Sequence, residues 1–357
     1  MGSAGQRDIR HGRRRGFGET LLCYPFRASR VLPVSRLFLL PLLVTLIFIG
    51  SAPARAEVAL VTSIKPLQLI AAAVQEGVGE PQVLLPAGAS AHHYALRPSD
   101  VRQIRNADLF YWIGPDMEAF LEPVLKGREG PSVAAQALPG LTLRHFGDEH
   151  VESHHGHDEH THEADDHDAH EAHAADGHHD HAHRPGSLDA HLWLLPANAL
   201  VIAANMADKL ATVDPANAAR YQANLDAFRQ RLDALDQRLT KRLSDTSPKP
   251  FFVFHEAYDY FEAAYGLAHA GVFAAGEAQP GARHVAEMRQ RLEQAGPSCV
   301  FYEPPIRPRL ADSLIRDLPV QVAELDAMGQ GIEATAGGYE RLIENLGMSL
   351  AACLESL

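Results

Sequence analysis

The stretch PANAARYQANLDAFRQRLDALDQRLTKRL, residues 215–243, decides how the rest of this chain is arranged. Its apolar residues recur at spacings of three and four: Tyr221, Leu225, Phe228, Leu232, Leu235, Leu239 and Leu243. This periodicity predicts one amphipathic helix of about 30 residues, roughly 45 Å long. Because such a helix is longer than one small lobe, we expect it to run along or between two lobes. A coiled-coil dimer seam is the alternative, although the stretch holds only about four heptads.

On the N-terminal side of this helix, apolar runs alternate with helical patterns. The predicted strands are 58–64, 83–85 and 108–113. The predicted helices are 66–77, 99–106, with Ser99 and Asp100 as capping residues, and 117–125. Strands separated by helices, with few hairpin signals, indicate βα units around a mainly parallel sheet.

The same alternation returns after Pro248 and Pro250. Strands are predicted at 251–254, 270–274, 299–302 and 320–325, an amphipathic segment at 256–265, and helical segments at 284–295, 309–316 and 337–354. We therefore expect an α/β fold in which two βα lobes with mainly parallel sheets are joined by a long rigid helix. The predicted parts are a signal peptide (1–56), an N-terminal lobe (57–195) containing a disordered loop (144–184), linking helices (196–247) and a C-terminal lobe (248–357).

The first 56 residues have the composition of an export signal. Arginines precede the apolar run LFLLPLLVTLIFIG (37–50), and the small residues of 54–56 (ARA) follow it. The run is short for a permanent anchor and Pro41 interrupts it. We expect cleavage near Ala56 and a soluble periplasmic protein; an uncleaved N-terminal anchor is the alternative.

Cysteine usage agrees with export. Cys23 would leave with the signal peptide, whereas Cys299 and Cys353 form an even pair in an oxidising compartment. We predict a disulfide between them that closes a loop of about 55 residues.

Residues 145–183 contain 14 of the 21 histidines and 12 acidic residues. Imidazole suits zinc, copper, nickel and iron, and carboxylates can complete a coordination shell. Because the tract has no apolar stripe, we predict a disordered, metal-attracting loop; an acidic solubilising linker is the alternative. The histidines assigned to this accessory loop are His154, His155, His157, His160, His162, His167, His170, His173, His178, His179, His181 and His183. The net charge of −13 argues against nucleic-acid binding.

Three histidines outside the tract share a sequence context. His92 follows the loop after the 83–85 strand, His191 lies within LDAHLWLLP, and His255 directly follows FFVF. Loops at the carboxyl ends of parallel strands converge on one crevice. Taken singly, each is a candidate for a hydrogen-bonded structural histidine. Their shared context, together with the tract, indicates a metal site.

Several runs of residues resemble the motifs of one family. They are PAGASAHHYALRPSD (86–100), DLFYWIGPDMEAF (108–120), DAHLWL (189–194), FFVFHEAY (251–258), QPGA (279–282) and FYEPP (301–305). They resemble the metal-binding subunits of bacterial ABC importers, the ZnuA-type zinc-uptake proteins, and the resemblance spans 57–357 in order. It implies the two-lobed periplasmic metal-binding-protein fold, with Zn²⁺ as the transported ligand. The implied partners are an inner-membrane zinc ABC permease with its ATPase and a periplasmic zinc-accessory protein; the implied state is a monomer.

The resemblance also implies a ligand set. His92, His191 and His255 are expected to bind the metal, with Asp326 as the fourth ligand and water as the alternative. Asp326 has a second interpretation as the cap of the following turn. Some relatives offer a carboxylate at the position of Ala91, and that source is absent here. Three nitrogen donors favour zinc over the more oxygen-preferring manganese.

The remaining polar residues near these motifs receive structural roles. We expect His93 to face solvent or lie behind the ligands. His269 and His284 are expected to be structural, and Glu256 to lie at the surface or behind the ligands. Glu303 is expected to be an inter-lobe hydrogen-bond or ion-pair partner.

The expected function is capture of zinc in the periplasm and its delivery to a permease, with the His-rich loop collecting or sensing zinc. A periplasmic zinc hydrolase is one alternative, because zinc on three histidines with an open position can activate water. No HExxH helix is present, and Asp326 would close that position, so we expect no enzymatic activity. A zinc-buffering or adhesin-like surface protein is the other alternative.

Overall fold

The computed structural model describes residues 57–147, 186–246, 248–274, 281–305 and 315–357. Residues Glu57–Leu357 form one compact unit. Among the described helices, none is long and apolar enough to cross a membrane. The predicted signal peptide, most of the predicted 309–316 helix and the accessory histidines His154 to His183 lie outside the described residues.

The N-terminal lobe contains a parallel sheet of four strands in the order β2-β1-β3-β4. The strands are β1 (Leu60–Thr62), β2 (Gln82–Val83), β3 (Leu109–Trp112) and β4 (Ser132–Ala134). Strands β1 and β3 are fully buried, as their continuous apolar sequences predict. Strand β4 was not predicted; its sequence SVA is partly exposed and forms no apolar run.

Short helices complete this lobe: α2 (Lys65–Val74), α3 (Pro98–Asn106), α4 (Pro115–Glu118), η2 (Ala119–Leu121) and α5 (Glu122–Leu125). Helix α3 is capped differently from the prediction: Arg97 is the N-cap, and its backbone N–H donates to Asp100 at 2.8 Å. The predicted 117–125 helix is divided, because Pro123 fits only the first turn of a helix and begins a new one.

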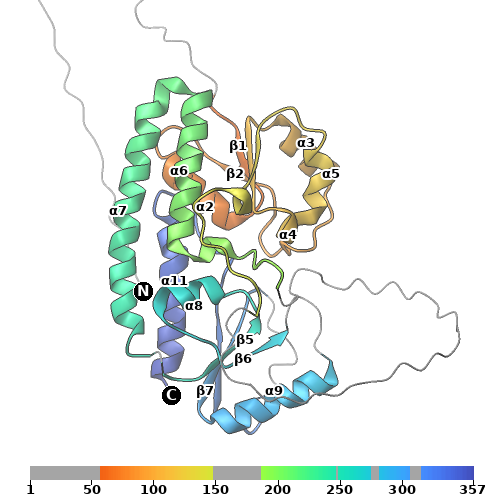
Figure 1. Cartoon of the computed structure of the whole chain (residues 1–357), viewed down its shortest axis with the longest axis vertical. Coiled ribbons are helices and arrows are strands. Elements are labelled where there is room, and N and C mark those ends of the chain that lie inside the picture. The colour runs from red at the N-terminus through yellow and green to blue at the C-terminus, as the bar shows by residue number, and fades with distance from the viewer. Residues whose placement is uncertain (1–56, 148–185, 247, 275–280, 306–314) are drawn as a thin grey trace, which may run out of the picture. The chain divides into compact units, whose positions relative to one another are not determined.

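Two long helices connect the lobes, α6 (Pro196–Val213) and α7 (Ala218–Leu243). Asp214 ends the first and organises the turn, because its carboxylate accepts hydrogen bonds from Asn217 at 2.6 Å and Tyr221 at 3.0 Å. Helix α7 has 26 residues, and its predicted apolar stripe is buried throughout. The stripe packs against helices of its own chain and runs past both lobes (Figure 1), which removes the basis for the coiled-coil alternative.

The C-terminal lobe repeats the topology of the first, with parallel strands in the order β6-β5-β7-β8. Its strands are β5 (Phe251–His255), β6 (Gly271–Ala274), β7 (Ser298–Tyr302) and β8 (Val320–Glu324). Its helices are α8 (Asp259–Tyr265), α9 (Ala282–Ala295) and α11 (Gly338–Glu355). All four predicted strands of this lobe are confirmed.

The alternation along β5 separates two layers of core. Phe251 and Val253 join the main core, whereas Phe252 and Phe254 face the other side of the sheet. Because successive side chains of a strand point to opposite faces, this sheet is covered on both sides. The second cluster contains Phe252, Phe254, Phe273, Met288, Leu292 and Val300, and α9 covers it.

Helix α11 ties the C-terminal lobe back to the rest of the protein. It packs against α2 and α7 as well as against β7 and β8. The predicted disulfide is present, with Cys353 of α11 bonded to Cys299 of β7. Three ion pairs join α7 to α11: Arg231–Glu340, Arg238–Glu344 and Arg242–Glu355. The two lobes are therefore held by a shared layer of packed helices.

The carboxyl ends of the strands carry the polar residues of both lobes. The loop after β2 holds His92, and β5 ends at His255. Glu303 directly follows β7, and Asp326 lies two residues beyond β8. In parallel sheets these ends are where ligand sites form.

Candidate metal centre

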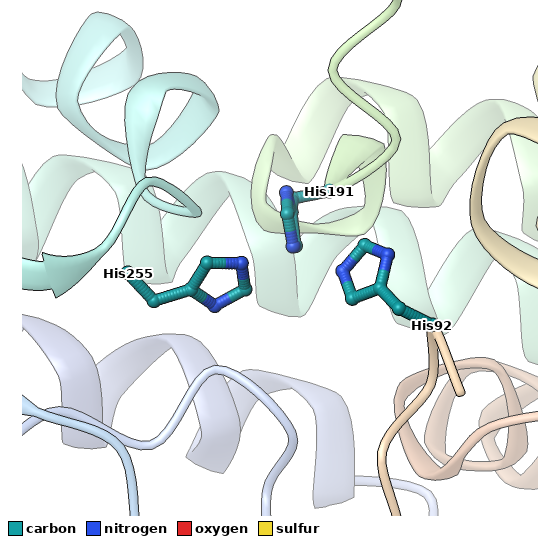
Figure 2. A group of neighbouring side chains, drawn as sticks. All are labelled: His92, His191 and His255. Carbon is teal, nitrogen blue, oxygen red and sulfur yellow. The ribbon is translucent and has the colours of Figure 1, made fainter. Parts of the chain in front are cut away.

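Three histidines from three separate elements meet at one point. His92 lies in the loop after β2, His191 precedes the η4 turn (Leu192–Leu194), and His255 ends β5. One ring nitrogen from each lies within 4.8 Å of the others. The ring centroids are 5.5 Å apart for His92–His191, 5.7 Å for His92–His255 and 5.0 Å for His191–His255. Figure 2 shows the three rings turned toward a common centre.

These histidines line a cavity of about 350 Å³. Its other walls include Met117, Trp193, Glu303, Pro305 and Met328. The lining comes from both lobes, so a bound ion would lie between them. The imidazoles can replace part of the water shell of a cation, and the apolar walls limit the access of solvent to it.

His191 is held by a buried carboxylate. Its Nδ1 lies 2.7 Å from Oδ1 of Asp189, and its backbone N–H donates to the same oxygen at 2.9 Å. Both side chains are almost fully buried. When Asp189 is ionised, it accepts the Nδ1 proton of His191, which leaves the Nε2 lone pair for a metal.

His255 is held in the same way from the other lobe. Its Nδ1 lies 3.2 Å from Oε2 of Glu303. The hydroxyl of Tyr258 lies 3.2 Å from the second oxygen of that carboxylate and also hydrogen-bonds to the Leu325 carbonyl. Glu303 therefore orients an imidazole of its own lobe: it is a hydrogen-bond partner, as predicted, but these two bonds lie within the C-terminal lobe and not between the lobes.

The first histidine is positioned by its backbone. The N–H groups of His92 and His93 both donate to the Ser90 hydroxyl, at 3.1 and 2.9 Å. This turn directs the His92 ring inward and leaves His93 exposed, as predicted for His93.

The electrostatics of the cavity keep the imidazole of His191 available. Burial, together with the neighbouring His255, lowers the pKa of His191 to about 3, so this ring stays neutral at physiological pH. Burial also raises the pKa of Asp189 to about 7. Burial acts to raise the pKa of Glu303 as well, but His255 and Tyr258 outweigh it and the net shift is downward. A cation in the cavity would favour the ionised form of both carboxyls.

The Asp326 carboxylate accepts three backbone hydrogen bonds. Oδ1 accepts from Met328 at 3.0 Å and Gly329 at 2.9 Å, and Oδ2 accepts from Gln330 at 2.6 Å. These bonds shape the turn that presents Met328 to the cavity. Among the described residues, the cluster within 4.8 Å contains the three histidines and not Asp326. The turn-capping interpretation is thus present, and metal ligation by Asp326 stays a prediction.

Other polar residues occupy separate environments. The His269 ring contacts Glu262 of α8, and the His284 ring contacts the Val272 carbonyl at 3.0 Å. Glu256 is half-buried. Sequence reasoning did not assign a role to Asp189, although the Asp-Ala-His spacing of 189–191 was visible; a carboxylate two residues before a metal-binding histidine is the signal that could have identified it.

A family model for the zinc-uptake complex component A, periplasmic (ZnuA), matches residues 60–353. The chain belongs to the ZnuA family. One relative is the high-affinity zinc uptake system protein ZnuA of Yersinia pestis, 38% identical over 303 residues, which are 84% of this chain and 92% of the relative. Another is the protein of the same name from Brucella abortus (strain 2308), 37% identical over 316 residues, 86% of this chain and 95% of the relative. The resemblance found in the sequence motifs is confirmed.

Solved structures share the ZnuA-family fold at low sequence identity. The protein FpvC of Pseudomonas aeruginosa in complex with Mn²⁺ has a TM-score of 0.66 at 20% identity, over 84% of this chain and 99% of its own. The periplasmic zinc-binding protein TroA of Treponema pallidum has a TM-score of 0.66 at 18% identity, over 84% of this chain and 99% of its own. A Zn(II)-bound variant of AdcAII from Streptococcus pneumoniae has a TM-score of 0.62 at 22% identity, over 82% and 98%. They confirm the predicted fold of two α/β lobes.

Proposed function

We propose that this member of the ZnuA family captures Zn²⁺ in the periplasm at His92, His191 and His255 and delivers it to an inner-membrane ABC permease with its ATPase. The convergence of three imidazoles in a cavity between two lobes carries this proposal. Its relatives in Yersinia pestis and Brucella abortus are named high-affinity zinc uptake proteins, which supports the same cargo. Zinc is the transported ligand in this function, so no catalytic turnover is expected.

The donor chemistry favours zinc among the divalent cations. Zinc binds neutral imidazole at about 2.0–2.1 Å, so two nitrogens of a tetrahedral site lie roughly 3.3–3.5 Å apart. The three ring nitrogens here lie within 4.8 Å of one another, and small rotations of the side chains are enough to reach that spacing. Manganese prefers oxygen donors, and the carboxylates of Asp189 and Glu303 contact imidazoles.

Asp326 is our proposed fourth ligand, with water as the alternative. An ionised carboxylate offers about four lone-pair directions. Three are used by backbone N–H groups, two on Oδ1 and one on Oδ2. Oδ2 therefore retains one direction for a metal, and the backbone bonds would fix its orientation. If Asp326→Ala weakens zinc binding no more than about threefold, water is the better assignment.

The signal peptide and the accessory histidines complete the proposed route of the ion. The signal peptide is cleaved near Ala56, and the protein acts as a periplasmic monomer. The accessory histidines between His154 and His183 raise the local zinc concentration or report its supply, and a periplasmic accessory protein assists. The composition of these segments supports the proposal: in 1–56 arginines precede a short apolar run, and 148–185 is rich in histidine and carboxylate residues.

A zinc titration tests the proposed centre. His92→Ala combined with His255→Ala is expected to abolish one tight zinc site, measured by competition with a chelator. His284→Gln is the matched control, because this exposed histidine lies outside the cluster. A double variant that keeps as many tight zinc sites as the parent would refute the assignment. Hydrolytic turnover that depends on the three histidines would favour the hydrolase alternative.

A further inference from the structure

A second group of metal-binding side chains lies on α8 and the segment that follows it. Asp259, Glu262 and His269 each offer one ligand atom within 4.8 Å of the other two. Nδ1 of His269 lies 3.0 Å from each oxygen of Glu262 and 3.8 Å from Oδ1 of Asp259. The backbone N–H of His269 also donates to Glu262 at 3.0 Å. The cluster is distinct in its residues from the three-histidine centre.

The spacing of these atoms is close to that of a tetrahedral zinc site. With bonds of about 2.0–2.2 Å to nitrogen and oxygen, adjacent ligand atoms lie roughly 3.3–3.6 Å apart. The separations of 3.0 and 3.8 Å around Nδ1 of His269 lie on either side of that value. An ion would therefore replace the proton that Nδ1 of His269 shares with Glu262. Only small movements of the three side chains would be needed to bind it.

Asp259 lacks the partners that a largely buried carboxylate normally has. Its side chain is only 17% exposed. Within the described ranges, its one partner closer than 4 Å is the His269 ring at 3.8 Å, beyond hydrogen-bond distance. The Asp259 oxygens are not among the buried atoms without a partner, so they reach solvent and are accessible to a cation.

The surrounding charge is also suited to a cation. Asp259 lies within electrostatic reach of the acidic groups Glu262 and Asp189, and Glu256 acts on His269. His269 and Arg144 act on Asp259 in the opposite direction and offset only part of this negative charge. Asp259 and Glu262 are three residues apart on one helix, where like charges repel unless a cation joins them. The first turn of α8 lowers that repulsion but does not remove it.

We propose that Asp259, Glu262 and His269 bind a second divalent cation of the zinc class, with water completing its coordination. Two carboxylates and one imidazole form a harder donor set than three imidazoles, so this site should discriminate less against manganese. The site lies beside the main centre, because the Tyr260 hydroxyl donates to the Asp189 carbonyl at 2.9 Å. The contrasting interpretation is a metal-free hydrogen bond between Glu262 and His269 that only orders the segment after α8.

The test uses the whole chain with every histidine of 148–185 changed to serine, so that the tract does not add zinc. The parent is expected to bind two zinc ions in equilibrium dialysis, and His92→Ala with His255→Ala is expected to keep one. In that background Asp259→Asn and, separately, His269→Gln should each remove the remaining ion. His284→Gln and the exposed Asp226→Asn are matched controls that should keep it.

Three results would overturn the proposal. They are a parent that binds one zinc and keeps it in His269→Gln, a His92→Ala and His255→Ala chain that binds none, and a remaining ion that survives both Asp259→Asn and His269→Gln. If His269→Gln does not fold, Asp259→Asn decides, because that isosteric change removes no hydrogen bond among the described residues. Failure of the main centre gives a different pattern: His269→Gln alone would then leave the parent without zinc.

Discussion

The buried imidazole of His191 and the buried carboxylate of Asp189 form a pair, with Nδ1 and Oδ1 2.7 Å apart. The same oxygen accepts the His191 backbone N–H, so the carboxylate fixes both the ring and its backbone. A carboxylate behind a metal-binding histidine sets its tautomer and raises its basicity. Asp189 is thus expected to matter for zinc affinity without touching the ion.

Asp189→Asn tests this role with almost no change in volume. We expect zinc affinity to fall about 10- to 100-fold, because the amide holds the ring less firmly and cannot stabilise positive charge. Competition titration with a chelator measures the change. The exposed Asp226→Asn serves as the control and should leave the affinity unaltered. An Asp189→Asn protein with the parental affinity would show that the pair is only structural.

The number of protons released on zinc binding should depend on pH. Burial raises the pKa of Asp189 to about 7, so at pH 6 the zinc-free protein holds a proton there, and at pH 8 it does not. His191, with a pKa of about 3, stays neutral at both. Since a bound cation favours ionised Asp189, affinity should fall below pH 7 by up to about tenfold per pH unit from this group alone.

Calorimetry in buffers of different protonation enthalpy counts these protons. We expect about one more proton released at pH 6 than at pH 8 from the raised pKa of Asp189. In Asp189→Asn this extra proton should be absent. Equal release by the two proteins at pH 6 would contradict the assignment.

Glu303 is expected to act on His255 as Asp189 acts on His191. Its bond is longer, at 3.2 Å, and its side chain is 29% exposed. Glu303→Gln should therefore weaken zinc binding by about tenfold, the lower end of the 10- to 100-fold range expected for such carboxylates. Tyr258→Phe removes only the hydroxyl next to Glu303 and should cost less. Chelator competition on both variants gives the order, and a larger loss in Tyr258→Phe would contradict it.

The disulfide is expected to stabilise the fold and not the site. Cys299 lies near the start of β7, whereas Glu303 follows its end. Joining residues 54 apart in sequence removes loop entropy from the unfolded chain, worth roughly 3–4 kcal/mol. Cys299→Ser with Cys353→Ser should lose about that free energy of unfolding in urea, while zinc affinity changes less than threefold. Loss of zinc binding in the folded double variant would refute this separation.

The sequence predicts the lobes well because their signals are local. The stripe of α7 and the apolar runs of β3, β5 and β7 each identify an element without reference to the rest of the chain. Strand β4 could not be predicted because an edge strand of three partly exposed residues has no apolar run. Helices α4 and α5 were predicted as one helix because Pro123 can begin a helix as well as end one.

The site was only partly predictable. His92 and His255 could be placed because both follow strands, whose carboxyl ends meet at one edge. The carboxylates that orient imidazoles depend on contacts across the fold, such as Glu303 on His255, 48 residues apart. Asp326 shows the same limit, since its three backbone bonds are set by a turn that spacing alone does not reveal.

The two ends of the histidine tract are hydrogen-bonded to each other close to the proposed metal centre. His145 and Leu188 form an antiparallel bridge, Phe146 and Ser187 are hydrogen-bonded at 3.0 Å, and the Asp189 N–H donates to Arg144 at 2.9 Å. Because these bonds close the chain on both sides of 148–185, a short glycine linker can replace that segment without disturbing Asp189.

Deletion of 148–185 should therefore leave the tight zinc site within about threefold of its parental affinity, because none of His92, His191 and His255 is removed. Weak sites carried by the accessory histidines should be lost from the titration. Cells that carry the deletion should grow more slowly only when zinc is scarce, since the proposed role of these histidines is to raise the local zinc concentration. A protein with the linker and every deleted histidine restored as a fused C-terminal tail is the control. Loss of the tight site on deletion would place zinc capture in the tract, whereas parental growth at the lowest zinc supply would remove the proposed role of the tract in scavenging.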